Sequence, residues 1–280
     1  MSNWIEKIST SLKFSLKPKT IPDGLWSTCE NCQQIIYKDS LIQKLYICPN
    51  CGHHKRLKPN ERASIFLNKD SYKEIFQEIE SKDILKFKDS KSYKIRLSDA
   101  KKTSGSNEAL SVYKGSLKEH EVILCVFNFF FMGGSMNAAV GSKFVAAANL
   151  AMEENKALIC FSASGGARMQ EGLTSLMQMA KTSAIIEKMS ETKTLFISIL
   201  TDPTMGGVSA SLAMLGDIII AEPKATIGFS GARVIKQTVG QDLPEGFQKS
   251  EFLLKHGAID MIVSREDLRN TVSTIISNLI

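Results

Sequence analysis

The chain has 280 residues, 43% of them hydrophobic and 23% charged, a composition typical of a soluble globular protein with one large core and a small appended module. No apolar run reaches the roughly 20 residues that a membrane helix requires. The net charge is +6, and residues 1–58 hold most of it, with nine Lys and Arg against four acidic residues. This basic balance indicates an anionic partner: nucleic acid, a nucleotide-like substrate or an acidic subunit.

The first 24 residues show apolar side chains at helical spacing together with several lysines, at Trp4, Ile5, Ile8 and Leu12. The pattern is compatible with a transit peptide, but Glu6 and the lack of arginines favour a small amphipathic docking helix. Since the chain shows no secretory signal, we expect a reducing cytoplasm, with the plastid stroma as the alternative.

Four cysteines follow in two C-x2-C pairs separated by 15 residues: Cys29, Cys32, Cys48 and Cys51. This spacing is typical of a zinc ribbon in which four thiolates enclose one tetrahedral zinc ion and leave no position for substrate. Two disulfides are the alternative, but they would need an oxidising compartment. The sequence therefore predicts one structural Zn²⁺ in a module spanning residues 25–58.

Beyond the ribbon, apolar spacing predicts a helix over Asn60–Ser81, and the polar stretch Ser81–Ser106 predicts exposed loops with a short helix. Leu110–Val126 has two apolar runs around a polar turn, which indicates a β-hairpin. Three strand-to-helix units then follow, each with a Gly-Gly pair at the junction: Gly133-Gly134, Gly165-Gly166 and Gly206-Gly207. Alternating strands and helices predict an α/β domain with largely parallel strands.

The glycine pairs carry the chemical interpretation. A single Gly-Gly before a helix can serve only a tight turn, and Gly133-Gly134 is interpreted in this way. Repeated junctions, however, expose backbone N–H groups that a carbonyl oxygen can approach, as in an oxyanion hole. Phosphate binding is the competing use, but the phosphate-loop and dinucleotide glycine motifs are absent.

A nucleophilic enzyme has little support in the sequence. Ser162 and Ser164 precede a glycine pair, but the four histidines lie away from these junctions. Cys125 and Cys160 lie within apolar strands and are interpreted as inert core thiols.

Several segments together resemble the biotin-dependent acyl-CoA carboxyltransferases: Phe161–Gly172, Leu200–Ser211, Ala221–Gly228 and Gln248–Val263. With the four-cysteine ribbon, the chain is similar to the beta-subunit family of bacterial and plastid acetyl-CoA carboxylase carboxyltransferases. The resemblance implies a crotonase-like ββα superhelix over residues 59–280. It also implies carboxyl transfer from carboxybiotin, carried on a separate carrier protein, to acetyl-CoA, which yields malonyl-CoA for fatty-acid synthesis.

The same resemblance implies an assembly of two alpha and two beta subunits that works with a biotin carboxyl carrier protein and biotin carboxylase. Nucleotide binding, including ATP binding, is part of this expectation. The backbone amides of Gly165, Gly166, Gly206 and Gly207 are expected to form or shape the oxyanion holes. Arg168 is expected either to contact substrate or to form a structural ion pair. Lys55, Arg56 and Lys58 are expected to attract the phosphates of CoA.

Two other functions stay open from sequence alone. The basic ribbon could bind RNA or another nucleic acid, although no interleaved aromatic motif accompanies it. A crotonase-like hydratase or thioesterase would use the same glycine junctions without a second chain.

Overall fold

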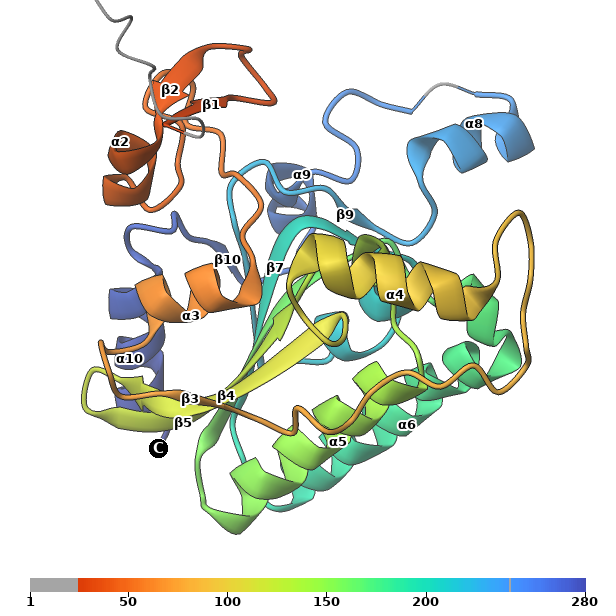
Figure 1. Cartoon of the computed structure of the whole chain (residues 1–280). Helices are drawn as coiled ribbons and strands as arrows, with labels where there is room; N and C mark the ends of the chain where they lie inside the picture. Colours follow the sequence, from red (N-terminus) through yellow and green to blue (C-terminus); the bar gives the residue numbers. More distant parts are fainter. Residues whose placement is uncertain (1–24, 242) are drawn as a thin grey trace, which may run out of the picture.

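The computed structural model of the chain describes residues 25–241 and 243–280. A small amino-terminal module lies above one end of a larger α/β body (Figure 1). The amphipathic segment expected within residues 1–24 lies outside the described residues. No helix of the described part is both long and apolar enough to cross a membrane.

The strands are β1 (Trp26–Thr28), β2 (Ile35–Tyr37), β3 (Lys73–Ile75), β4 (Leu110–Leu117), β5 (His120–Phe127), β6 (Ala157–Ser164), β7 (Phe196–Met205), β8 (Ile218–Ala221), β9 (Ile227–Gly228) and β10 (Met261–Ile262). The α-helices are α2 (Lys38–Gln43), α3 (Pro59–Phe66), α4 (Tyr93–Ser104), α5 (Ala138–Glu153), α6 (Leu173–Glu191), α7 (Gly206–Ser209), α8 (Ala232–Val239), α9 (Ser250–Lys255) and α10 (Leu268–Leu279). Short 3-10 turns are η1 (Met132–Gly134), η2 (Met169–Glu171) and η3 (Leu212–Met214).

One mixed sheet organises the body, in the order β10-β8-β7-β6-β5-β4-β3. Strands β3, β4 and β5 are antiparallel neighbours, whereas β5, β6, β7, β8 and β10 run parallel. The parallel strands therefore end at one common edge of the sheet. In an open α/β sheet this carboxyl-terminal edge is where ligands bind.

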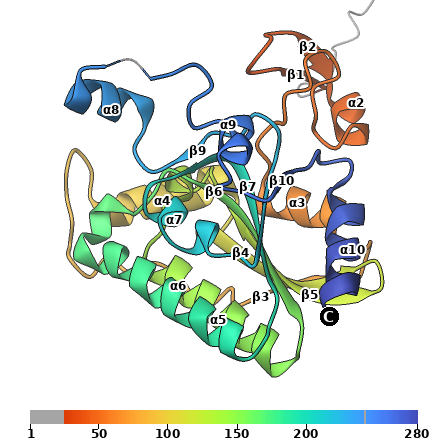
Figure 2. The same ribbon diagram turned by 180° about the vertical axis from the view of Figure 1, so that it is seen from behind.

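Helices cover both faces of this sheet (Figures 1 and 2). Along β5, Ile123 and Cys125 pack with helices α4, α5 and α6, whereas Val122 and Leu124 pack with α3 and α10. The alternation of strand side chains, together with burial on both faces, explains why β5 and β6 read as continuous apolar runs. The crotonase-like α/β class expected from the sequence is confirmed.

The predicted helix over Asn60–Ser81 is wrong beyond its first two turns. Helix α3 ends at Phe66, and the chain then turns through Asp70, whose φ is +59°. Residues Lys73–Ile75 pair with β4 as an antiparallel edge strand, which places Glu74 opposite Tyr113. This pairing satisfies backbone groups of the hairpin edge, so tertiary pairing outweighed the apolar spacing that suggested a helix.

Most of the other expected elements are confirmed. Strands β4 and β5 form the predicted hairpin, and helices α5 and α6 follow the first two glycine pairs. The expected helix after Gly206-Gly207 is instead two short turns, α7 and η3. Helix α4 is less exposed than expected, because Tyr93, Leu97 and Ala100 enter the core.

A buried carboxylate joins the amino-terminal module to the body. Glu222 accepts hydrogen bonds from Arg62 at 2.6 Å and from Arg265 at 2.8 and 2.9 Å. Arg265 also donates to the carbonyl oxygens of Leu45 and Lys55 in the module. Burial alone would raise the pKa of Glu222, but the two arginines outweigh burial and hold it well below its usual range. One carboxylate thus fixes the module on the sheet.

We expect Glu222→Gln to destabilise the protein by about 3–5 kcal/mol, because it leaves two buried arginines without a counter-charge. Chemical denaturation measures the change. Glu121→Gln is the control, since that carboxylate is 67% exposed beside Lys156 and should contribute less than about 1 kcal/mol. Because Glu222 has a depressed folded-state pKa, its contribution is present above its usual value of 4.5 and is lost as the pH falls. Equal stability of the two variants would contradict this role.

Candidate active site at the glycine pairs

The three glycine pairs meet at the carboxyl-terminal edge of the sheet. The N–H of Gly165 donates to the carbonyl oxygen of Gly133 at 2.9 Å, and Met136 N–H donates to the carbonyl oxygen of Gly166 at 2.8 Å. Gly206 lies against Gly166: a Cβ placed on Gly206 would lie 2.8 Å from the Cα of Gly166. Segments far apart in sequence thus touch backbone to backbone.

Glycine is required at this contact for two reasons. Gly166 has φ of +121° and Gly206 has φ of +60°, which side chains rarely allow. Neither position has space for a Cβ without displacing the facing backbone. Gly134 also has a structural role, because a Cβ there would overlap the carbonyl oxygen of Ala163.

Among the four glycines expected at the oxyanion holes, the backbone N–H groups differ. Gly165, Gly166 and Gly206 donate to the Gly133 carbonyl, the Ser164 hydroxyl and the Phe229 carbonyl, respectively, at 2.9–3.0 Å. These three amides shape the junction and are already engaged. By contrast, the N–H of buried Gly207 has no acceptor within residues 25–241 and 243–280.

A second amide is also without an acceptor in the described part of the chain, that of Ala167. The Cβ of Ala167 lies 3.5 Å from the point where a Cβ on Gly207 would stand, so the two residues are neighbours although they belong to different junctions. Ala167 and Gly165 line a cavity of about 430 Å³. Because polar groups inside proteins are nearly always hydrogen-bonded, this pair of free donors indicates a ligand oxygen. Sequence reasoning missed Ala167, although it follows the glycine pair directly.

Arg168 forms the structural ion pair that was one of its two expected roles. Its guanidinium donates to Glu108 at 2.8 Å, and both side chains are fully buried. The remaining N–H groups donate to Ser135, Ser81 and Tyr93, so all five donors are used. Arg168 also lines the cavity, but its role there is to fix the wall.

Glu171, three residues further on, joins the second glycine junction to helix α5. Its carboxylate accepts hydrogen bonds from the Ala138 N–H at 3.0 Å and from Asn137 Nδ2 and Tyr93 Oη at 2.7 Å each. Burial raises the pKa of Tyr93 to about 12, so its hydroxyl stays protonated and donates. The buried side chains of Arg168, Glu108 and Glu171 therefore fix the second glycine junction, which carries the free amide of Ala167.

The three basic residues of the ribbon are not gathered at the glycine cavity. Lys55 donates to Ser27 Oγ at 2.6 Å within the module. Arg56 pairs with Asp202 at 3.2 Å and lies over the ring of Phe129 at 4.4 Å. Lys58 lines a different cavity.

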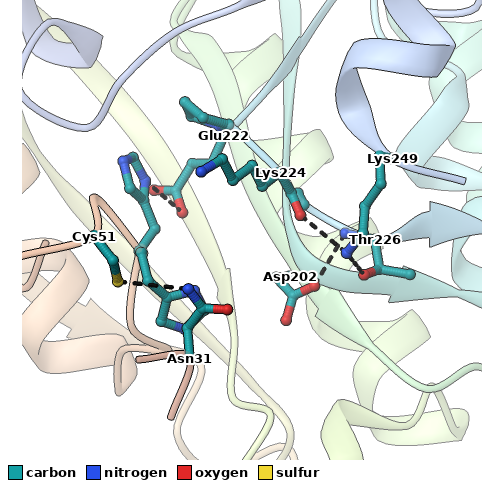
Figure 3. Close-up of a pocket in the computed structure, with 11 residues that line it drawn as sticks. Asn31, Cys51, Asp202, Glu222, Lys224, Thr226 and Lys249 are labelled. Atoms are coloured by element: carbon teal, nitrogen blue, oxygen red, sulfur yellow. Dashed lines mark hydrogen bonds and ion pairs between the residues drawn. The ribbon is translucent and has the colours of Figure 1, made fainter. Parts of the chain in front are cut away.

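A second cavity, of about 380 Å³, separates the ribbon from the body (Figure 3). Asn31 and Cys51 form its ribbon side, and Asp202, Thr226 and Lys249 lie opposite them. Asp202 accepts from the Thr226 N–H at 3.0 Å, and Lys249 donates to the Thr226 hydroxyl at 2.8 Å. Asp202 lies in the last part of β7, just before the Gly206-Gly207 pair, so the ribbon lies over the same sheet edge as the glycine pairs.

The four ribbon cysteines converge as free thiols, and their sulfur atoms all lie within 4.8 Å of one another. Cys29 Sγ lies 3.7 Å from Cys51 Sγ, and Cys32 Sγ lies 3.8 Å from Cys48 Sγ. Tetrahedral bonds of about 2.3 Å would separate the sulfurs by about 3.8 Å. The cluster is compatible with one structural zinc.

The serines and core cysteines considered as nucleophiles line neither of these two cavities. Ser162 and Ser164 are buried, and Ser164 Oγ accepts the Gly166 N–H. Burial raises the pKa of Cys160 to about 12 and that of Cys125 well above its usual value, as expected of core thiols.

Two family models match the chain. The carboxyl transferase domain matches residues 61–274, and the acetyl-CoA carboxylase zinc finger domain matches residues 26–51. Nothing in these matches supports the ATP binding that was expected.

Solved structures share the fold. A transcarboxylase 12S core with bound methylmalonyl-coenzyme A aligns with a TM-score of 0.63 at 24% identity, over 79% of this chain and 41% of that one. A Pseudomonas malonate decarboxylase hetero-dimer aligns with a TM-score of 0.61 at 21% identity, over 79% of this chain and 86% of that one. The beta subunit of P. aeruginosa geranyl-CoA carboxylase aligns with a TM-score of 0.61 at 14% identity, over 84% and 40%.

The chain thus spans about two-fifths of the transcarboxylase it matches. The family model nevertheless covers most of the chain, including every glycine pair, and the ribbon model covers all four cysteines. The chain belongs to the carboxyl transferase family and carries the zinc ribbon of acetyl-CoA carboxylase.

Proposed function

We propose that this chain is the acyl-CoA-binding subunit of an acetyl-CoA carboxylase carboxyltransferase, which moves a carboxyl group from carboxybiotin to acetyl-CoA. The observation that carries the proposal is the pair of free amides, Gly207 and Ala167, at the sheet edge beneath the ribbon. Two adjacent N–H donors suit a thioester oxygen that becomes negative. Loss of a methyl proton from acetyl-CoA produces such an enolate oxygen.

In this mechanism the protein contributes donors and shape. The two amides would stabilise the enolate oxygen while the acetyl carbon gains the carboxyl group. Carboxybiotin, delivered on a separate carrier protein, supplies the carboxyl group and can accept the methyl proton at its freed ureido nitrogen. The engaged amides of Gly165, Gly166 and Gly206 hold the two junctions together. Lys55, Arg56 and Lys58 would add a positive field for CoA at long range.

We also propose that Cys29, Cys32, Cys48 and Cys51 hold one zinc ion per chain. The matching sulfur separations and the family match support this occupancy. Because all four ligands come from the protein, the ion would stabilise the ribbon without touching substrate. Through Arg265 and Glu222, the ribbon would stay above the catalytic edge.

The proposed partner is an alpha-type carboxyltransferase subunit, in an assembly of two copies of each chain. Large apolar side chains are exposed at the start of α6 and in the preceding turn, namely Met169, Leu173, Leu176 and Met177, each at least 50% exposed. Leu85, 57% exposed, lies beside them against Gly172. Met169 also lines the glycine cavity, so a chain covering this apolar face would close the site.

Replacement of Gly207 by valine should lower malonyl-CoA formation about 10²–10³-fold. A side chain at this position would crowd Met179 and Ala167 and so displace the backbone N–H, and loss of one oxyanion donor costs about 3–4 kcal/mol. Gly166→Val should act similarly by separating the facing junctions. The assay uses the complex of both subunits, after folding and zinc content are verified.

Gly231→Val is the matched control, since a Cβ there meets no atom within 4 Å and its φ is −63°. Ser164→Ala should lower the rate less than tenfold, because no serine nucleophile is proposed. Near-normal turnover in Gly166→Val and Gly207→Val, or an inactive but folded Ser164→Ala, would contradict the mechanism.

Elemental analysis of reduced protein should give one zinc per chain, and Cys48→Ala should abolish it. Since structural zinc supplies folding free energy directly, the variant's ribbon should become sensitive to proteolysis while the body stays resistant. Cys160→Ala should keep its zinc and serves as the thiol control. A metal-free wild-type ribbon with intact folding would rule out the zinc site.

The double variant Leu173→Lys, Met177→Lys should weaken binding of the alpha-type subunit at least about tenfold, because it places two charges in the proposed apolar interface. Isothermal titration of the two purified subunits measures the affinity. Leu279→Lys, at an exposed leucine of α10 away from this face, should have no effect. Unchanged affinity in the double variant would place the interface elsewhere.

A further inference from the structure

A polar cavity of about 450 Å³ lies outside the site described above. Its walls come from the start of α3, from β3 and the residues after it, from the loop after α4, and from β4 and α5; the residues used below are Lys58, Glu74, Ser106, Tyr113 and Lys143. It shares no lining residue with the glycine cavity. Its volume is within the range of about 300–1,000 Å³ that small-molecule sites occupy.

Lys143 is the unusual group in this cavity. The residue is only 2% exposed, yet its ammonium makes no hydrogen bond or ion pair with any residue in the described ranges. Four glutamates, among them Glu74 and Glu108, act on it only from longer range, and burial lowers the pKa of Lys143. The nitrogen is not among the fully buried side-chain atoms, so it opens onto the cavity, and burial of the rest of the side chain disfavours its charge. Its partner is therefore to be sought in the cavity.

The neighbouring groups define the chemistry of that partner. Lys58 adds a second positive charge, and Ser106 Oγ, which accepts from Asn128 at 2.9 Å, keeps its own proton to donate. Glu74 also lines the cavity, and its carboxylate has no hydrogen-bond partner in the described part of the chain. Two lysines and a hydroxyl suit an oxyanion, whereas the carboxylate requires that the ligand carry a proton as well.

We propose that this cavity binds a protonated oxyanion, namely dihydrogen phosphate or the monoanion of a phosphomonoester, with Lys143 as its anchor. Phosphate oxygens accept hydrogen bonds from Lys143 and Lys58, and a remaining P–OH donates to Glu74. The charged residues that line the cavity, Lys58, Lys143 and Glu74, sum to +1, which a singly charged phosphate balances. Glu78, Glu80 and Glu108 act on Lys143 from outside this lining. Sulfate has the same shape but no proton to donate near neutral pH.

Binding of inorganic phosphate at about pH 6, where a phosphate group is partly protonated, tests the site directly. Isothermal titration of the full chain in a phosphate-free buffer should show saturable binding, with sulfate at least about tenfold weaker. Lys143→Met should weaken phosphate binding at least about tenfold, as expected when a charge-assisted hydrogen bond is lost. Lys193→Met, at an exposed lysine whose ammonium has no partner in the described part of the chain, is the matched control and should bind phosphate normally.

Thermal unfolding separates this role from a structural one. Without phosphate, Lys143→Met should have a Tm equal to or above that of the wild type, because it removes a charge that burial disfavours and that has no partner in the described residues. With phosphate, only the wild type and Lys193→Met should gain stability. A destabilised Lys143→Met that still binds phosphate, or a wild type that binds phosphate no better than sulfate, would overturn the proposal.

CoA and dephospho-CoA identify the source of the phosphate, since CoA differs by its 3′-phosphomonoester. If Lys143→Met removes the affinity advantage of CoA over dephospho-CoA, the cavity holds that phosphate of the proposed substrate. If it removes only binding of inorganic phosphate, the site serves a free anion. Neither the phosphate titration nor the comparison of CoA with dephospho-CoA depends on turnover. Both therefore stay informative if the proposed malonyl-CoA formation is not observed.

Discussion

The contact between Gly166 and Gly206 is the constraint on which the site depends. Two strand-to-helix junctions, forty residues apart in sequence, meet with a distance that excludes any side chain. The contact is possible because β6 and β7 are parallel neighbours and end at the same edge. It makes Gly207 and Ala167 neighbours, and the N–H groups of both residues are without acceptors in the described residues. An oxyanion site made of backbone requires this close approach, because the donors cannot extend toward the ligand as side chains can.

Buried ion pairs support this edge from two sides. Beneath the glycine junction, Arg168 and Glu108 are both fully buried and fully hydrogen-bonded. On the opposite side, Glu222 joins Arg62 and Arg265 and so fixes the ribbon above the edge. Such pairs contribute little net stability compared with apolar packing, but they fix one geometry, since any rearrangement leaves a charge unpaired.

Lys143 contrasts with these arginines. Arg62, Arg168 and Arg265 each have a carboxylate partner at hydrogen-bond distance, whereas the ammonium of Lys143 faces a polar cavity without one in the described ranges. A protein that pairs its other buried cations so completely has little structural reason to leave this one unpaired. The proposed phosphate would supply the missing oxygen atoms.

The sequence alone determined what depends on local spacing. The cysteine pairs converge because each C-x2-C places two sulfurs on one turn, and the glycine pairs mark junctions because apolar strands end just before them. The α/β alternation and the hairpin at Leu110–Val126 follow from apolar periodicity in the same way. The motif segments were also sufficient to identify the family.

Only the tertiary structure decided what depends on neighbours distant in sequence. Residues 73–75 became an edge strand because β4 offered unpaired backbone groups, which no local pattern reveals. Arg168 proved to be a buried ion pair because Glu108, sixty residues earlier, lies against it. The free amide of Ala167 and the unpartnered ammonium of Lys143 were likewise invisible in the sequence, because whether a donor is satisfied depends on every group that the fold brings within hydrogen-bond distance.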